Sequence, residues 1–368
     1  MTEKEAYVAF NLTENIGSVG VARLAARYGS VAAAWEAYPK KASRSGKGEV
    51  DWRKEIAKAE SLGVKLLTPA DGDDYPPQLR SASGHPLCLY VKGNCKVLSR
   101  PSIAMVGTRR ATPYGRDQAY FFGRELSAAS WTIVSGLAFG IDAESHKGAL
   151  ANGVAPHIGV IGSALNEFYP EENVHIAQEI VRQGGAVVSE FPFGRKPDQT
   201  TFPQRNHVVA ALARGVLVVE APIKSGTMIT AGLAADLGRQ VMAIPGRVDS
   251  PSAAGCLKLI RDGATLVRTP EDVIDEMGNL FHVCAGGGKR EEAASSGGRH
   301  EGANAAPLSV PEAKLLRLLD SQGIEIDELV RKSGLGAAQV NSIAMALLVK
   351  GRVRFLPGNR VALPRGES

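Results

Sequence analysis

Short apolar runs alternate with longer segments of helical spacing between Ile103 and Met277, and this alternation constrains the fold more than any other feature of the chain. The apolar runs are residues 103–106, 131–134, 157–161, 186–188, 216–219, 241–244 and 265–267. The segments with helical spacing are residues 115–129, 142–152, 172–183, 202–213 and 227–237. Strands that alternate with helices of about 10–15 residues predict βαβ units. We therefore expect an α/β fold with a parallel sheet that helices cover on both faces.

Residues 1–72 predict a small helical domain in front of this sheet, because their apolar positions recur at helical spacing. The segment from Asn15 to Gly20 interrupts the pattern with a Gly-x-x-Gly spacing. Such a turn is typical of helix-hairpin-helix (SAM-like) modules, which present backbone N–H groups to a phosphate. A plain turn in a small helical bundle explains the same pattern and is favoured, because the turn contains no basic residue.

Two further segments follow the predicted sheet domain, which spans residues 73–280. Residues 281–307 are rich in Gly, Ala and charged residues and predict a flexible linker. Residues 308–368 predict a winged helix-turn-helix domain. Helical spacing recurs there at 312–320, 326–333 and 337–350, and two alternating strands joined through Pro357-Gly358-Asn359 form the wing.

The positive charge of the chain is concentrated in this last domain. The formal net charge is +5, but residues 331–368 contain seven basic residues and one acidic residue. The remainder of the chain is therefore close to neutral, which excludes a uniformly basic nucleic-acid-binding protein. The basic tail has three open interpretations: a site for nucleic acid, a solvated face, or a docking site for an acidic protein.

The sequence does not indicate a membrane protein, a secreted protein or a metalloprotein. The longest apolar stretch, residues 208–223, is interrupted by Arg214, Glu220 and Pro222, so no membrane span is expected. The N-terminus is polar and does not resemble a signal peptide, which favours the cytoplasm. The four cysteines form no Cys-x-x-Cys pair, so we expect reduced thiols and no metal site or cofactor.

Glycine-rich loops follow three of the predicted strands, where parallel sheets bind their ligands. Gly107-Thr108-Arg109-Arg110 precedes one helix, Gly136 to Gly140 precedes the next, and Lys224-Ser225-Gly226-Thr227 begins a third. Glycine turns and helix N-termini supply N–H donors that suit a phosphate, and arginine adds forked donors. Lys147 lies on the second of these helices and can reach back across its first turns. The loops together predict either an extended groove for a polyanion or a pocket for one nucleotide.

A set of short motifs occurs in a characteristic order. The motifs are Val106-Gly-Thr-Arg-Arg110, Ser135-Gly-Leu-Ala-Phe-Gly-Ile-Asp142, Tyr169-Pro170, Ser189-Glu-Phe-Pro192, Phe202-Pro-Gln-Arg-Asn206, Glu220-Ala-Pro-Ile-Lys-Ser-Gly-Thr227 and Ile244-Pro-Gly246. In this order they resemble the DNA-processing protein A family, also called DprA or Smf, over about residues 73–280. The resemblance implies an extended Rossmann-like domain that binds single-stranded DNA and forms a homodimer. It also implies that the protein protects incoming DNA and loads the RecA recombinase during natural transformation, without catalysing a reaction.

The loops and the resemblance together predict the residues that bind nucleic acid. They are Gly107, Thr108, Arg109, Arg110, Gly136, Phe139, Gly140, Lys147, Arg205, Asn206, Lys224, Ser225, Gly226 and Thr227. The chain departs from the family pattern where Phe139 and His207 replace arginines and where Leu257 replaces an asparagine. Phe139 can stack on a base instead, in a contact worth about 1–3 kcal/mol.

Two alternative functions remain open. Phosphoribohydrolases that activate cytokinins share this type of sheet and use a Gly-Gly-x-Gly-Thr-x-x-Glu segment. The corresponding segment here has Thr230 in place of the glutamate, so N-glycosidic cleavage would lack its acid or base. The second alternative is a transcription regulator in which the winged tail binds duplex DNA and the sheet senses a small ligand.

Overall fold

The computed structural model describes residues 1–38 and 50–285, and residues 314–363 except 321–322, 337–338, 341–342, 345–346, 348–351 and 357–359. The chain divides into two compact units, Met1–Gly288 and Lys289–Ser368, which are described separately. The expected linker lies mostly outside the described residues, because its residues 286–307 are among those left out.

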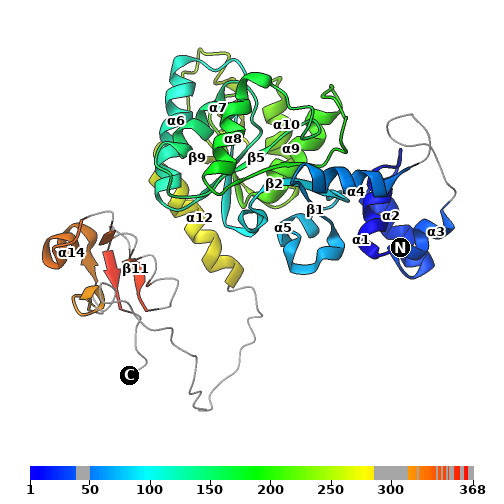
Figure 1. The fold of residues 1–368 in the computed structure, drawn as a ribbon. Coiled ribbons are helices and arrows are strands. Elements are labelled where there is room, and N and C mark those ends of the chain that lie inside the picture. The colour runs from blue at the N-terminus through cyan, green and yellow to red at the C-terminus, as the bar shows by residue number, and fades with distance from the viewer. Residues whose placement is uncertain are drawn as a thin grey trace, which may run out of the picture. The chain divides into compact units, whose positions relative to one another are not determined.

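A nine-stranded sheet forms the centre of the first unit, in the order β1-β2-β6-β5-β4-β3-β7-β8-β9 (Figure 1). The strands from β6 to β9 in this order pair in parallel, as the alternating pattern predicts. Seven strands agree with the predicted runs to within one or two residues at each end. They are β3 (Ser102–Val106), β4 (Thr132–Ser135), β5 (Ile158–Val160), β6 (Ala186–Ser189), β7 (Gly215–Val218), β8 (Gln240–Ala243) and β9 (Thr265–Leu266).

The sheet differs from the prediction at one edge, where two strands are antiparallel. Strand β2 (Leu89–Gly93) pairs antiparallel with β6, and β1 (Lys65–Leu67) pairs antiparallel with β2. The chain between β2 and β3 is short, so β2 must end at the side of the sheet where β3 begins. Strand β2 therefore runs in the opposite direction to β3 and to the parallel strands. The sheet is thus mixed, and its first strand lies inside residues 1–72, which were expected to be helical.

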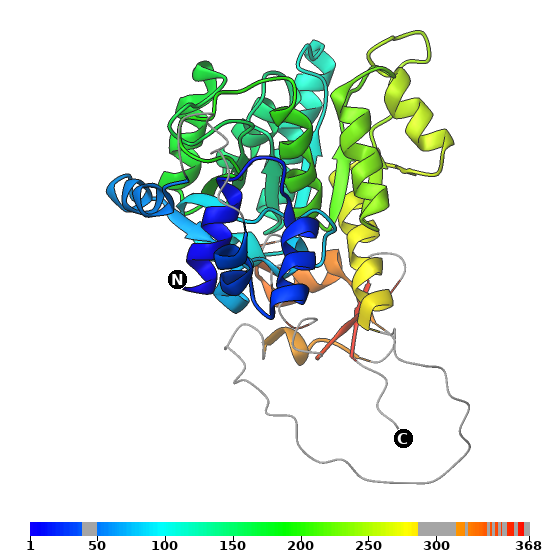
Figure 2. The ribbon, with the colours of Figure 1, turned by 90° about the vertical axis from the view of Figure 1, so that its right-hand side faces the viewer.

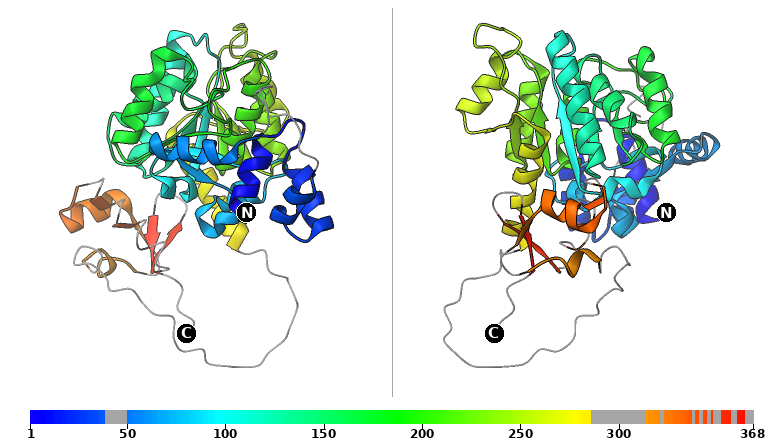
Figure 3. Two further views of the ribbon diagram at one scale, coloured as in Figure 1. Left: turned by 45° about the vertical axis from the view of Figure 1, so that its right-hand side comes forward. Right: turned by 90° about the vertical axis from the view of Figure 1, so that its left-hand side faces the viewer.

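Helices cover both faces of the sheet (Figures 1 and 3). Within β3, Ile103 and Met105 face one apolar core, whereas Ala104 and Val106 face the other, because side chains alternate along a strand. The first face is covered by α6 (Pro113–Ala128), α7 (Ile141–Leu150), α8 (Val174–Arg182) and α12 (Pro270–Ala285). The second face is covered by α5 (Pro77–Arg80), α9 (Thr201–Leu212), α10 (Gly226–Asp236) and α11 (Ala254–Arg261).

The N-terminal residues form helices beside the β1–β2 end of the unit, in shades of blue in Figure 2. They are α1 (Glu3–Asn11), α2 (Ser18–Tyr28), α3 (Val31–Ala37) and α4 (Trp52–Ser61). Phe10 of α1 packs against α3, because its ring lies perpendicular to that of Trp35 at a centroid distance of 5.0 Å. The Gly-x-x-Gly segment that interrupts the helical pattern of the sequence forms a turn between α1 and α2, where Asn15 adopts a left-handed φ of 57°.

The second unit has the features of a winged helix within its described residues. Helix α14 (Ile326–Ser333) ends at Gly334, which has a left-handed φ of 66°. Strands β11 (Arg354–Leu356) and β12 (Arg360–Ala362) pair antiparallel as the predicted wing, and β10 (Ile324–Glu325) adds a third strand beside β12. The predicted wing turn, Pro357 to Asn359, lies outside the described residues.

Candidate nucleic-acid interface

The loop after β3 carries Arg109 and Arg110 on a fixed backbone. The N–H of Thr108 donates to the backbone oxygen of Glu220 at 2.7 Å, which ties this loop to the loop after β7. Gly107 has no room for a side chain, because a Cβ there would lie 2.4 Å from Ile141. Arg109 and Arg110 are both exposed. The loop therefore presents two guanidinium groups from a backbone that is held in place.

The carboxylate of Glu220 also holds the loop after β3 in place. It accepts from the N–H of Thr112 at 2.9 Å, from the hydroxyl of Thr112 at 2.8 Å and from the hydroxyl of Ser252 at 2.7 Å. Thr112 is the N-cap of α6, where its hydroxyl oxygen accepts from the N–H of Gly115 at 3.1 Å. Glu220 is only 5% exposed, so it joins the loops after β3, β7 and β8 and is not available to a ligand.

The loop after β4 packs directly on the first loop. Gly140 has a φ of 74°, and a Cβ there would lie 2.4 Å from the backbone oxygen of Thr108. The amide of Asn173 donates to the backbone oxygens of Leu137 at 2.9 Å and Ala138 at 3.1 Å, which fixes the loop from its other side. Phe139, at the tip, keeps 37% of its surface exposed. The loop thus holds an aromatic ring at the surface.

Arg205 has a different environment from the one that the sequence suggests. It is 5% exposed, and its Nη1 donates to the backbone oxygen of Val160 at 2.9 Å and to that of Gly136. Burial and the nearby charge of Arg109 lower the pKa of Arg205, whereas Asp142 acts in the opposite direction. Arg205 therefore connects the ends of β4 and β5, and it forms part of the wall of a pocket instead of an exposed contact.

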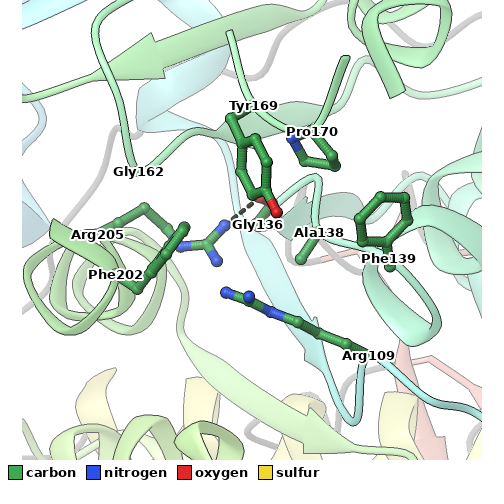
Figure 4. Close-up of a pocket in the computed structure, with 9 residues that line it drawn as sticks. All are labelled: Arg109, Gly136, Ala138, Phe139, Gly162, Tyr169, Pro170, Phe202 and Arg205. Carbon is green, nitrogen blue, oxygen red and sulfur yellow. Dashed lines mark hydrogen bonds between the residues drawn. The ribbon is translucent and has the colours of Figure 1, made fainter. Parts of the chain in front are cut away.

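This pocket, which we call the Arg109 pocket, is formed by Arg109, Gly136, Ala138, Phe139, Gly162, Tyr169, Pro170, Phe202 and Arg205. Figure 4 shows the guanidinium groups of Arg109 and Arg205 directed toward one another, with the Tyr169 ring beside them. The guanidinium carbon of Arg109 lies 4.5 Å from the centre of the Phe202 ring. The rings of Phe202 and Tyr169 are 6.2 Å apart, and Tyr169 is 42% exposed. Positive charge and exposed aromatic surface thus occur in one place.

The predicted phosphate-binding loop at the start of α10, residues 224–227, does not line this pocket. Lys224 and Gly226 are exposed, whereas Thr227 is buried. Ser225 is the N-cap of α10, and its hydroxyl donates to the backbone oxygen of Pro222 at 2.8 Å. Asn206 is the nearest predicted residue, because a Cβ on Gly226 would lie 4.0 Å from its Nδ2. Asn206, on the same helix as Arg205, therefore lies beside this loop.

Two other residues do not take the positions that the sequence suggested. Lys147 is exposed on α7 and pairs with Glu144 at 2.9 Å, so it does not line the pocket. His207 is half-buried, and burial lowers its pKa. Its Nε2 lies 4.0 Å from a Cβ built on Gly84, in the segment before β2. Replacing an arginine by His207 therefore removes no charge from the pocket.

The candidate residues taken from the sequence did not include Tyr169 and Phe202, which supply two of the three aromatic rings of the pocket. Both occur in the motifs Tyr169-Pro170 and Phe202-Pro203 that carry the family resemblance, so the signal was present. Their shared location depends on how the chain after β5 and the start of α9 meet in space, which no local pattern reveals.

The described residues give no indication of a metal or of a membrane span. Among them, no three His, Cys, Asp or Glu side chains lie close enough to hold a metal ion together. None of the helices within these residues is long and apolar enough to cross a membrane. Cys88 and Cys256 are buried and Cys95 is half-buried, each as a free thiol.

Comparison with known families gives two matches on this chain. Residues 65–278 match the family "DNA recombination-mediator protein A", and residues 299–359 match the "DprA winged helix domain". Protein Smf of Escherichia coli is 35% identical over 300 residues, which cover 81% of this chain and 78% of that protein. Protein Smf of Synechocystis is 30% identical in a match that covers 98% of this chain and 98% of that protein.

Two solved structures are also similar to this chain. The X-ray structure of DNA processing protein A from Streptococcus pneumoniae has a TM-score of 0.62 and 31% identity, and the match covers 75% of this chain and 98% of that one. A structure that describes the single-stranded DNA binding mode of DNA processing protein A from Helicobacter pylori has a TM-score of 0.52 and 29% identity. That match covers 60% of this chain and 96% of the other.

Proposed function

The chain belongs to the DNA-processing protein A (DprA/Smf) family of DNA recombination mediators, and from this premise we propose that it binds single-stranded DNA in the Arg109 pocket. The observation that carries the proposal is the exposed guanidinium group of Arg109, which the Phe202 ring holds beside the exposed rings of Phe139 and Tyr169. A guanidinium group held at the surface attracts an anion and offers it forked donors. A phosphate of a DNA strand supplies that anion.

The exposed rings favour a single strand over a duplex. Bases in a duplex are stacked and paired, so their faces are not available to a protein ring. Bases in a single strand can stack on aromatic side chains, and Phe139 and Tyr169 are 37% and 42% exposed beside the two arginines. The single-stranded DNA binding mode described for the Helicobacter pylori protein supports the same assignment.

The biological role extends this proposal. We place the protein in the cytoplasm, where it protects incoming single-stranded DNA, works as a homodimer and loads RecA recombinase during natural transformation. Family membership supports these statements, because the matched family is one of recombination mediators.

We also propose that the protein is not an enzyme. The segment after Gly226 and Thr227 carries Thr230 where the phosphoribohydrolases have a glutamate. Thr230 is 2% exposed, and its hydroxyl donates to the backbone oxygen of Gly226 at 3.2 Å. A buried hydroxyl in that bond is a poor general acid or base. Incubation with nucleoside monophosphates should therefore release no free base above a buffer control.

Fluorescence anisotropy with labelled single-stranded and duplex oligonucleotides of one sequence tests the binding proposal. The full chain should bind the single strand more tightly, and Arg109→Ala should lose most of the difference. Arg124→Ala is a matched control, because Arg124 is exposed near the other end of α6 and pairs with Glu125. Equal binding of both forms by the wild type and by Arg109→Ala would overturn the proposal.

A further inference from the structure

A second and larger cavity lies on the same unit, between the N-terminal helices and the sheet domain. Its volume is about 450 Å³, which falls within the range of small-ligand sites. One wall is the turn from Glu14 to Gly17, the second is the loop from Phe191 to Arg195, and Gln204 of α9 completes it. We call it the Gln204 groove.

The loop wall of the groove is held by neighbouring elements. The N–H of Phe193 donates to the carboxylate of Glu55 on α4 at 2.8 Å, and the same carboxylate accepts from the hydroxyl of Tyr90 at 2.9 Å. The floor is apolar, because Ile16 is 8% exposed and Phe191 is 3% exposed. This wall of the groove is therefore preformed, so a ligand loses little free energy in ordering it.

The groove and the Arg109 pocket share the first turn of α9. Phe202 and Arg205 line the pocket and lie one helical turn apart, on one side of α9. Gln204 lies between them in sequence, so it faces a different side of the same turn, toward the groove. The pocket and the groove therefore lie on two sides of the same helical turn.

The chemistry of the groove suits a base better than a phosphate. Asn15 and Gln204 are exposed amides that both donate and accept hydrogen bonds, as base edges require. The only cation among its lining residues is Arg195, which already pairs with Asp198 at 2.5 Å. Glu14 on the rim is acidic, which disfavours a contact that depends on phosphate alone.

We propose that the Gln204 groove is a second nucleotide subsite for the DNA strand that occupies the Arg109 pocket. This inference rests on the proposed function. It gives the N-terminal turn a role in binding bases, in place of the phosphate contact that a helix-hairpin-helix module would make. Only a strand long enough to reach from the pocket across α9 gains from it.

Two lengths of oligothymidylate, about five and about fifteen nucleotides, test the proposal with the full chain in anisotropy titrations. Gln204→Glu should weaken binding of the long strand about tenfold and leave the short strand unchanged, because a negative charge in the groove repels the strand. Val154→Glu is the matched control, because Val154 is 56% exposed in the loop before β5, at the opposite edge of the sheet. It should change neither affinity.

A second variant, Asn15→Gly, removes the other amide and suits the left-handed backbone at that position. It should weaken only the long strand, with the melting temperature unchanged. If Gln204→Glu and Asn15→Gly bind both lengths like the wild type, the subsite is wrong while the proposed function stands. If Gln204→Glu weakens both lengths equally, the groove is not a separate subsite. If the wild type binds neither length, both proposals fail.

Discussion

The guanidinium carbon of Arg109 lies 4.5 Å from the centre of the Phe202 ring, although the two residues come from the loop after β3 and the start of α9. This cation–π contact orients a flexible side chain over the pocket before any DNA is present. Arg205, on the same helix as Phe202, is held by the backbone oxygens of Gly136 and Val160. One helix therefore positions both guanidinium groups.

Removing one phosphate contact should change how binding depends on salt. Arg109→Ala should weaken single-strand binding and reduce the slope of log affinity against log salt by roughly 0.7, because one fewer counterion is released. The same change at the exposed Lys224 should have a similar effect. Titrations at several salt concentrations measure the slope, with Arg124→Ala as the control. An unchanged slope would assign either residue a structural role.

Phe139 should contribute through stacking, with little dependence on salt. Phe139→Ala should cost about 1–3 kcal/mol of single-strand affinity and leave the salt slope unchanged, because no charge is removed. Phe121→Ala is the matched control, since Phe121 is 39% exposed on α6 and does not line the pocket. A reduced salt slope in Phe139→Ala, or equal losses in both variants, would contradict a stacking role.

Stability should fall with decreasing pH because of two buried histidines. Burial lowers the pKa of His146 to about 3 and that of His157 to about 4. The unfolded chain has ordinary histidines, so it binds protons more readily below about pH 6.5. Each histidine should then reduce the free energy of unfolding by about 1.4 kcal/mol per pH unit, down to its folded pKa.

Urea unfolding between pH 7 and pH 5 measures this dependence. His157→Gln should flatten it. A free energy of unfolding that stays constant over this range would mean that the two buried histidines do not titrate as their surroundings require.

The winged helix should contribute a separate affinity that depends strongly on salt. Residues 331–368 contain seven basic residues and one acidic residue. Deleting residues 308–368 should lower affinity more at low salt than at high salt, and more for duplex than for single strands. Filter binding of both proteins over a salt series measures the effect. Identical binding by the two proteins at every salt concentration would make the tail a candidate for protein docking.

The sequence was sufficient to predict seven strands of the sheet and five of the helices that cover it, because a buried strand and its covering helices impose strong periodic patterns. Strand β3 illustrates this, since its alternating residues separate between two cores. The pattern did not predict the covering helices α5, α11 and α12, nor the antiparallel edge strands β1 and β2. The direction of an edge strand depends on the side of the sheet at which the next strand must begin, and not on the composition of the edge strand itself.

The candidate site was predictable only as a set of loops. An exposed arginine and a buried one look identical in a sequence, so the difference between Arg109 and Arg205 required the structure. The same limitation applies to Lys147, which pairs with Glu144 on its own helix, and to Tyr169, whose ring reaches the pocket from a separate loop. Such relationships depend on packing between segments that are distant in sequence.

Photocrosslinking of a single-stranded oligonucleotide containing iododeoxyuridine identifies the residues that stack on bound DNA, because the iodinated base reacts with an aromatic side chain that it stacks against. The crosslinked peptides are mapped by mass spectrometry. We expect crosslinks in the peptides that contain Phe139 or Tyr169, and their loss in Arg109→Ala. Efficient crosslinking that avoids both peptides and is unaffected by Arg109→Ala would contradict binding of single-stranded DNA in the Arg109 pocket.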